Sequence, residues 1–294
     1  MRLGIVTPVV NLNPRFDPPE WERSGGIDDV VAVALEAERL GYDFLGCPEH
    51  VAIPEAVAAT RGGRYWDPVA TLAFVAARTG SIRLLSHVAV LGYHHPLALV
   101  KQYGSLDEAS GGRVILGVGV GSLKAEFELL GAEFDGRGAL ADDALAAIRA
   151  SFGRRAREYH GTHFEIAGWI LEPCGLQEHV PIWVGGRSRR SLRRAIELGD
   201  GWIPFGMGLD GLRSMLTDPA VVRALADRPD PLEVVLAPEP PLDPVGDPSG
   251  AGRTLEAYGA LGATGLALRF RHDSRRHYVE QLGALRSLAA DRIA

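Results

Sequence analysis

Eight short runs rich in β-branched and aromatic residues alternate with eight helical patterns along the 294 residues of the chain. Such alternation is typical of a parallel sheet covered by helices, and eight β/α units suit a (β/α)8 barrel. An open doubly wound sheet is the alternative, but it would not usually need eight units. We expect an α/β TIM barrel that forms a single domain over residues 1–294. The expected strands are 3–9, 43–49, 82–91, 113–121, 181–186, 200–206, 232–238 and 265–270.

Helical patterns lie between these runs, and the clearest one covers 28–40, where apolar residues recur at helical spacing until Gly41. The other helices are expected near 67–79, 96–109, 141–152, 188–198, 211–226, 251–261 and 275–291.

Three connections are longer than simple turns and lie at 122–140, 153–180 and 237–250. The second contains YHGTHFEI, which predicts a hairpin. In a barrel the active site is built from loops at the carboxyl ends of the strands, where the first and third connections lie. We therefore expect extended loops at the carboxyl face and a roofed ligand pocket.

The composition excludes several classes of function. The net charge is −6 and the chain has no basic tail, so no nucleic acid partner is expected. Cys47 and Cys174 have no CxxC or CxxH neighbourhood, which gives no sign of a zinc site. The apolar N-terminus lacks a signal-peptide pattern, so we expect a cytoplasmic protein with no membrane partner. The expected partner is a small-molecule substrate, and a homodimer is a candidate assembly.

The fourth expected strand ends in GVGVG, with Gly117, Gly119 and Gly121 on one face and Val118 and Val120 on the other. Glycine weakens a strand, so three in register need a reason. If this face points into a barrel, it lets a planar ligand approach the backbone closely. The alternative is a strand that tapers so that a neighbouring side chain can pack. A dinucleotide fingerprint does not fit, because the third glycine comes one residue early.

The segment GGRSRRSLRRAIELGDGW joins the fifth expected strand to a helix. Arg187, Arg189 and Arg190 crowd the first turn, where the helix macrodipole is already positive. An anion would relieve this repulsion, and backbone N–H groups with Ser188 and Ser191 would form a phosphate cradle. The alternative is a solvated arginine-rich face.

Histidines follow two expected strands. Glu49 and His50 stand at the end of the second strand, and His87, His94 and His95 stand at the end of the third. Barrel catalysis is drawn from the carboxyl ends of strands, which makes His50 a candidate catalytic residue. The first expected strand offers no metal ligand, so no metal site is expected.

Three segments together resemble the bacterial luciferase-like oxidoreductases: the run from DPVATLAF to GVGVG (67–121), EFELLG (126–131) and VPIWVGGRSRRSLRRAIELGDGWIP (180–204). The resemblance is greatest to the branch that uses the deazaflavin coenzyme F420, and it is only architectural beyond residue 206. It implies a luciferase-like barrel with a flavin-type ring at the carboxyl face. Such a protein carries a hydride between the cofactor and a small organic substrate.

The resemblance also implies roles for particular residues. His50 matches a histidine that acts beside the reactive ring in sugar-phosphate dehydrogenases of this branch, and Glu49 is a weaker catalytic candidate. A bulge with a non-prolyl cis peptide is implied at His87–Val88, behind the ring. The implied cofactor-binding residues are His87, Val88, Gly119, Val120, Gly121, Gly185, Gly186, Arg187, Ser188 and Ser191.

Two positions depart from the family pattern, because Ser122 replaces a common Trp and His87 replaces a small residue. These two departures leave the identity of the substrate undetermined.

The choice of cofactor decides the type of reaction. A deazaflavin does not activate oxygen, whereas FMN allows monooxygenation. The three first-turn arginines suit a cofactor with more anions than one phosphate, which favours F420. An FMN-dependent luciferase-like monooxygenase and a non-catalytic flavin-binding relative are the alternatives.

Overall fold

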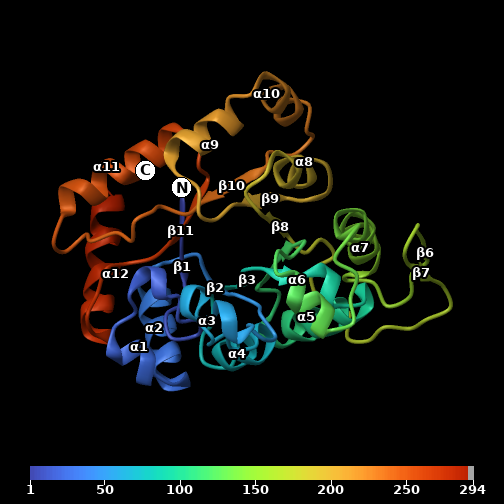
Figure 1. Ribbon diagram of the computed structural model, residues 1–294, viewed down its shortest axis with the longest axis horizontal. Coiled ribbons are helices and arrows are strands. Elements are labelled where there is room, and N and C mark those ends of the chain that lie inside the picture. The colour runs from blue at the N-terminus through green and yellow to red at the C-terminus, as the bar shows by residue number, and fades with distance from the viewer. Residues whose placement is uncertain (291–294) are drawn as a thin grey trace.

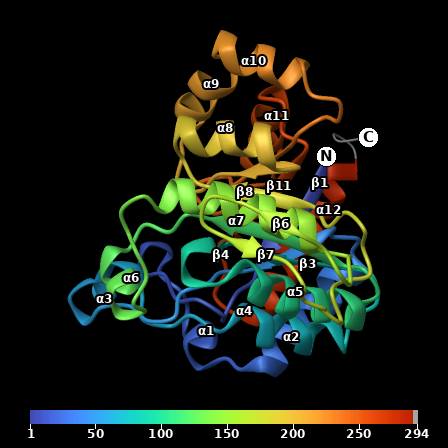
Figure 2. The same cartoon turned by 90° about the vertical axis from the view of Figure 1, so that its right-hand side faces the viewer.

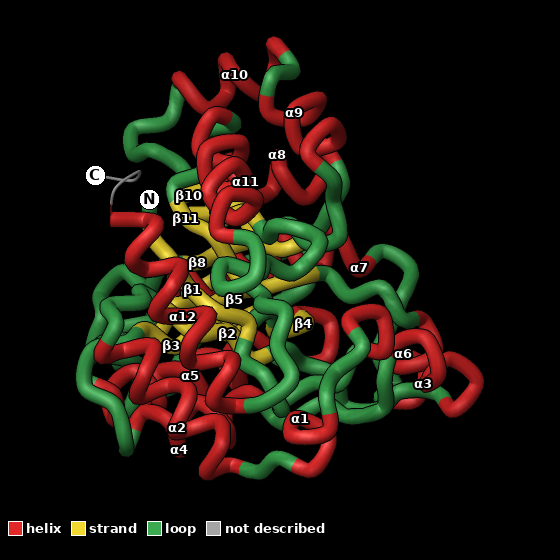
Figure 3. Tube along the Cα trace, turned by 90° about the vertical axis from the view of Figure 1, so that its left-hand side faces the viewer, coloured by secondary structure: helices red, strands yellow, loops and turns green. Residues whose placement is uncertain are grey.

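Eight parallel strand positions close into a barrel in the computed structural model, which describes residues 1–290 (Figure 3). The strands follow the order β3-β2-β1-β11-β10-β9-β8-β5, and β3 pairs with β5 to close the ring. The expected TIM barrel is therefore confirmed. The strands are β1 (Arg2–Val6), β2 (Phe44–Cys47), β3 (Arg83–Ser86), β4 (Ala89–Val90), β5 (Val114–Gly119), β8 (Ile182–Gly185), β9 (Gly201–Ile203), β10 (Glu233–Leu236) and β11 (Gly265–Leu268).

Helices surround this sheet on its outer side (Figures 1 and 2). The longer helices are α2 (Ile27–Arg39), α4 (Pro68–Ala76), α5 (Pro96–Ser110), α7 (Arg137–Ser151), α8 (Arg189–Leu198), α9 (Leu209–Leu216), α10 (Pro219–Ala226), α11 (Pro248–Ala260) and α12 (Arg275–Ala290). Short helical turns lie in the loops at η1 (Pro14–Phe16), α1 (Glu20–Ser24), α3 (Glu55–Arg61), η2 (Leu91–Tyr93) and α6 (Lys124–Leu129).

One expected helix differs from the structure. The segment 211–226 forms two helices, α9 and α10, because the Asp218 side chain accepts a hydrogen bond from the Ala220 N–H and Pro219 begins a new helix. The expected helix at 275–291 matches α12, and its last residue lies outside the described part of the chain. Among residues 1–290 no helix is long and apolar enough to cross a membrane.

The barrel interior is filled by side chains rather than open. The rings of Phe44 and Trp183 meet edge to face there, with centroids 5.1 Å apart. Val88 packs against this layer. A ligand site therefore has to lie above the layer, at a mouth of the barrel. One residue from each strand position contributes to the layer: Val6, Phe44, Leu85, Ile115, Trp183, Ile203, Val235 and Ala267.

The glycine face of β5 points inward, as expected, because Ile115 belongs to the interior layer. A Cβ added at Gly117 would lie 1.9 Å from the carbonyl oxygen of Ser86, and one at Gly119 would lie 2.7 Å from Cγ2 of Val88. The Ser86 carbonyl and the Val88 side chain thus occupy the space beside these two glycines. This agrees with the alternative that the strand tapers so that a neighbouring side chain can pack. A ligand against this face stays a prediction.

The expected strand at 82–91 is interrupted. β3 ends at Ser86 and β4 begins at Ala89, and the His87–Val88 peptide between them is cis. The cis bond implied by the family resemblance is therefore present at the expected position.

One extra residue lies in this interruption. Leu85 pairs with Ile115 of β5, and Ala89 pairs with Val118, so the β3–β4 segment uses one residue more than β5 over the same stretch. The extra residue works as a bulge that re-aims side chains. Val88 packs on the interior layer, whereas Ala89 joins the outer core.

The long connection at 153–180 contains the expected hairpin, formed by β6 (Tyr159–His160) and β7 (Glu165–Ile166). It projects from the side of the barrel (Figure 1). The carboxylate of Asp143 on α7 holds its turn, because it accepts hydrogen bonds from the N–H groups of His163 (2.7 Å) and Phe164 (2.9 Å).

Candidate active site

His50 lies beyond the end of β2, and Glu126 of α6 holds its ring. His50 Nδ1 is 2.7 Å from Glu126 Oε2. The same carboxylate accepts hydrogen bonds from the Tyr93 hydroxyl (2.7 Å) and from the N–H groups of Val51 (2.6 Å) and Ala52 (3.2 Å). The Glu126 side chain is fully buried, whereas 18% of the His50 side chain is exposed. The imidazole is thus fixed on one edge and reachable from solvent.

The charge on Glu126 determines the tautomer of His50. Burial alone would raise the pKa of Glu126, but the hydrogen bonds from Tyr93 and His50 outweigh it and lower that pKa. Burial and Glu126 in turn raise the pKa of Tyr93 well above its usual value, so this hydroxyl keeps its proton. An ionised carboxylate only accepts hydrogen bonds, which places a proton on His50 Nδ1. Nε2 is then the ring nitrogen at which His50 can exchange a proton.

Glu49 has other partners. Its Oε1 is 2.8 Å from His94 Nε2, and its Oε2 accepts a hydrogen bond from the Val90 N–H at 2.5 Å. Burial would lower the pKa of His94, but the hydrogen bond and charge of Glu49 raise it. The task of orienting His50 therefore belongs to Glu126, while Glu49 ties the end of β2 to β4. A catalytic role for Glu49 stays a prediction.

In the turn from β8 into α8, the backbone at Gly186 lies close to the side chain of Ser191. Gly186 has a φ of +113°, which L side chains rarely adopt, and a Cβ there would lie 2.9 Å from the Cβ of Ser191. Ser188 Oγ accepts from the Ser191 N–H, and Ser191 Oγ accepts from the Ser188 N–H, each at 3.1 Å. The two hydroxyls therefore form a reciprocal cap on the helix. Their contact with a phosphate stays a prediction.

The arginines at the start of α8 differ in their partners. Arg189 pairs with Asp218, and Arg190 lies 4.0 Å from Asp142. Protein carboxylates thus relieve much of the repulsion that the sequence indicates. Of these three arginines, only Arg187 makes no ion pair with the described residues.

Arg187 also lies near a second cation. Its Nη1 is 3.6 Å from the point that a Cβ on Gly206 would occupy, and Arg15 Nη1 is 3.9 Å from the same point. Arg15 pairs with Glu239 at 2.6 Å. Two guanidinium groups therefore lie near the same point, and only Arg15 has a carboxylate partner, which leaves the charge of Arg187 available to an anionic group.

His87 and Val88 are half-buried, and Val88 packs on the interior layer of the barrel. Burial, with the charge of Arg269, lowers the pKa of His87 to about 4, so its ring is neutral at pH 7. A neutral and an apolar side chain therefore lie at the bulge between β3 and β4, and Arg187, which has no ion pair with the described residues, lies at the start of α8. This arrangement fits a flavin-type ring that carries an anionic tail. Among the described residues there is no group of three or more side chains able to hold a metal ion.

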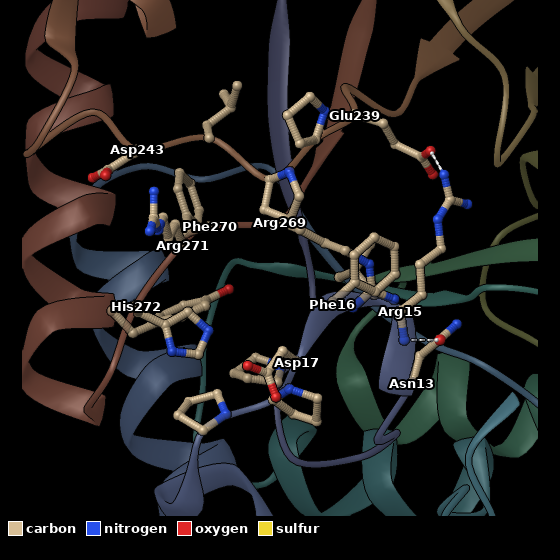
Figure 4. A pocket seen from close by; sticks show the side chains of 18 of the residues that line it. Asn13, Arg15, Phe16, Asp17, Glu239, Asp243, Arg269, Phe270, Arg271 and His272 are labelled. Atoms are coloured by element: carbon tan, nitrogen blue, oxygen red, sulfur yellow. Dashed lines mark hydrogen bonds and ion pairs between the residues drawn. The ribbon is translucent and has the colours of Figure 1, made fainter. Parts of the chain in front are cut away.

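A cavity of about 740 Å³ lies at the carboxyl ends of β1, β10 and β11 (Figure 4). One wall is the segment after β1, and the opposite wall includes the expected Pro-rich roof at 237–250. None of the site residues expected from the sequence lines it. Arg269 stands in its wall, just after β11.

Tyr65 connects this cavity to His50. Its ring meets the His50 ring edge to face, with centroids 4.6 Å apart. Tyr65 also forms an isolated β-bridge with Asn11, which lines the cavity. A chain of contacts through Tyr65 and Asn11 therefore joins His50 to the cavity wall.

Four residues of this mouth are absent from the sequence-based prediction: Glu126, Tyr93, Arg15 and Arg269. Glu126 lies in the EFELLG segment that carries part of the family resemblance, and that is the one signal that could have identified it. Tyr93 likewise lies in the run 67–121 that carries the resemblance, whereas Arg15 and Arg269 lie in loops without a distinctive pattern.

A family model described as luciferase-like monooxygenase matches residues 1–243. The uncharacterized protein Rv0953c of Mycobacterium tuberculosis is 30% identical over 278 residues, which cover 88% of this chain and 94% of that protein. The uncharacterized protein Rv0940c of the same organism is 29% identical over 216 residues, covering 69% and 74%.

Solved structures share the fold at low identity. The monooxygenase RslO1 from Streptomyces bottropensis has a TM-score of 0.77 at 20% identity, with 100% of both chains covered. The coenzyme F420 dependent tetrahydromethanopterin reductase from Methanopyrus kandleri has a TM-score of 0.74 at 13% identity, covering 100% of this chain and 99% of that one. The oxygenating constituent of 3,6-diketocamphane monooxygenase from Pseudomonas putida, in complex with FMN, has 0.73 at 15%, with the same coverage.

Proposed function

Because the chain belongs to the luciferase-like monooxygenase family, we propose that it is an oxidoreductase that uses coenzyme F420 to move a hydride to or from a small organic substrate. The reaction takes place at the carboxyl-end mouth of the barrel. His50 is the proposed catalytic residue, and the mouth residues from His87 to Ser191 are the proposed cofactor site.

The observation that carries the choice of F420 is the positive charge at Arg187. This guanidinium has no ion pair among residues 1–290 and lies beside Arg15, whose one carboxylate partner is Glu239. F420 carries a glutamate tail in addition to its phosphate. An FMN phosphate at the start of α8 would leave more of this charge without a partner.

F420, when bound, supplies two-electron hydride transfer without oxygen activation. The residues of the chain hold it in place. Val88 and the neutral ring of His87 would support the flat ring, and Arg187 with the start of α8 would bind the anionic tail. Gly119 and Gly185 leave room for Val88, whose side chain would clash with a Cβ at either position.

His50 handles the proton that accompanies the hydride. Oxidation of an alcohol releases one hydride and one proton, and reduction of a carbonyl consumes both. With Nδ1–H held by Glu126, Nε2 of His50 accepts the proton or donates it. Tyr93 keeps its own proton and holds Glu126 as a carboxylate.

Titration of the purified protein with F420 and with FMN, followed by tryptophan fluorescence, tests the proposal. We expect binding of F420 and turnover of that cofactor with a substrate from a panel of alcohols, aldehydes and enones. Tight FMN binding without an F420 response would favour the FMN-dependent monooxygenase. Tight cofactor binding with no turnover in the panel would favour the non-catalytic relative.

A further inference from the structure

Arg269 is a cation in the wall of the 740 Å³ cavity. Its guanidinium lies over the ring of Phe16, with Cζ 4.7 Å from the ring centroid (Figure 4). Among residues 1–290 its side chain forms no hydrogen bond or ion pair. Stacking uses only the face of a guanidinium, so its N–H edge remains available to a ligand.

The carboxylates around the cavity do not pair with the N–H edge of Arg269. Each of them is already held by another group of the protein. Arg269 and Arg271 form no ion pair with the described residues, so neither guanidinium has a carboxylate in direct contact. The held pairs are Asp17 with Arg23, Glu22 with His272 and the Val9 N–H, Glu239 with Arg15, Asp243 with Gln281, and Asp247 with the Gly250 N–H.

A half-buried guanidinium without a counter-ion is unfavourable, and burial lowers the pKa of Arg269. A ligand carboxylate would provide the bidentate partner that arginine binds best. A phosphate dianion suits the place less well, because five carboxylates line the same cavity.

The rest of the wall indicates what the carboxylate is attached to. Phe270, Leu242 and two pairs of prolines supply apolar surface. The buried hydroxyl of Tyr278 has no hydrogen-bond partner within residues 1–290. A cavity of about 740 Å³ is in the usual range for a small-molecule site. The lining therefore suits an apolar body with one acidic group and one further polar group.

The cavity is also coupled to the proposed reaction site. The charge of Arg269 contributes to the low pKa of His87, and Asn11 in the cavity wall pairs with Tyr65, which contacts His50. The charge of an acid anchored at Arg269 would therefore act on His87 as well.

We propose that the cavity is the substrate site of this protein, that Arg269 binds a carboxylate of the substrate, and that the substrate class is apolar organic acids. This inference rests on the proposed oxidoreductase function.

Calorimetry on the protein without cofactor tests the inference, with 3-phenylpropionate, its uncharged amide 3-phenylpropionamide, and phenyl phosphate as probes. We expect the carboxylate to bind on the order of tenfold more tightly than the amide, and more tightly than phenyl phosphate. Arg269→Gln should abolish the preference for the carboxylate. Arg193→Gln should keep it, because Arg193 is exposed and pairs with Glu197 on α8.

Equal binding of carboxylate and amide would overturn the inference, as would a carboxylate preference that survives in Arg269→Gln. Tighter binding of phenyl phosphate would overturn the proposed class. If Arg269→Gln does not fold, Arg269→Met replaces it, and an unchanged preference in that uncharged variant counts against the inference. Failure of F420 to bind, with carboxylate binding that still depends on Arg269, would remove only the proposed function.

Discussion

His50 Nδ1 and Glu126 Oε2 lie 2.7 Å apart although 76 positions of sequence separate the two residues. The contact joins the loop after β2 to the loop after β5, so it exists only once the barrel has closed. It fixes the tautomer of the imidazole at the carboxyl ends of the strands, where TIM barrels carry their catalytic residues.

His50→Ala should lower turnover by roughly 10²–10⁴-fold and leave cofactor affinity nearly unchanged, because the proton-transfer group is lost while the cofactor contacts remain. Steady-state kinetics and a fluorescence titration on the same variant separate the two effects. Glu126→Gln keeps the shape of the side chain but removes the charge that selects Nδ1–H, so turnover should also fall. Wild-type turnover in His50→Ala would end the catalytic assignment.

Arg187→Ala should weaken cofactor binding by about 1.5–3 kcal/mol, the range for a hydrogen bond to a charged group. Titration of the variant with the cofactor measures the change. Arg193→Ala is the matched control, since it removes an arginine from the same helix that already has Glu197 as partner. Equal affinity in wild type and Arg187→Ala would place the anion elsewhere.

Gly119→Ala should destabilise the protein by about 1–3 kcal/mol, because the new methyl group would lie 2.7 Å from Cγ2 of Val88. Val88→Ala removes the clashing methyl groups, so the double variant should lose less stability than the sum of the two single variants. Urea unfolding of all four proteins measures this coupling. Strictly additive effects would show that the two residues do not compete for the space.

His87 should make the protein without cofactor sensitive to acid. The pKa of His87 is lowered to about 4 in the folded protein, so between pH 6.5 and pH 4 the unfolded chain binds more protons. The free energy of unfolding should therefore fall as the pH drops through this window, by up to about 3 kcal/mol. His87→Gln should lose less stability between pH 7 and pH 4 in urea titrations. His163→Gln, at an exposed position, should behave like wild type, and an equal pH response in His87→Gln would contradict the prediction.

The barrel could be predicted because each β/α unit carries its own periodicity, and the order of the units then leaves few topologies. The inward face of the glycine strand followed from the alternation of side chains along β5. The short helices α1, α3 and α6 could not be predicted in this way. They span five to seven residues, and helices of that length depend on tertiary contacts rather than on a local pattern.

A site residue was predictable only where the residue and the groups that it interacts with lie in the same segment of the sequence. The arginines of α8 were visible in the sequence, but the carboxylates that pair with them, Asp142 and Asp218, come from α7 and from the residue before α10. The unpaired state of Arg187 could be recognised only after those partners had been located. The same holds for Arg269, whose stacking partner Phe16 lies near the other end of the chain.

The two walls of the mouth are encoded in different stretches of the chain. The proposed cofactor residues from His87 to Ser191 lie within the match to the family model, which ends at residue 243. Arg269, Phe270 and Tyr278, on the opposite wall, come after that match. A lineage could therefore inherit its redox cofactor intact while recombination or drift in the final segment altered what it oxidises or reduces. For protein engineering, chimeras joined near the end of β10 are a natural way to exchange specificity between relatives.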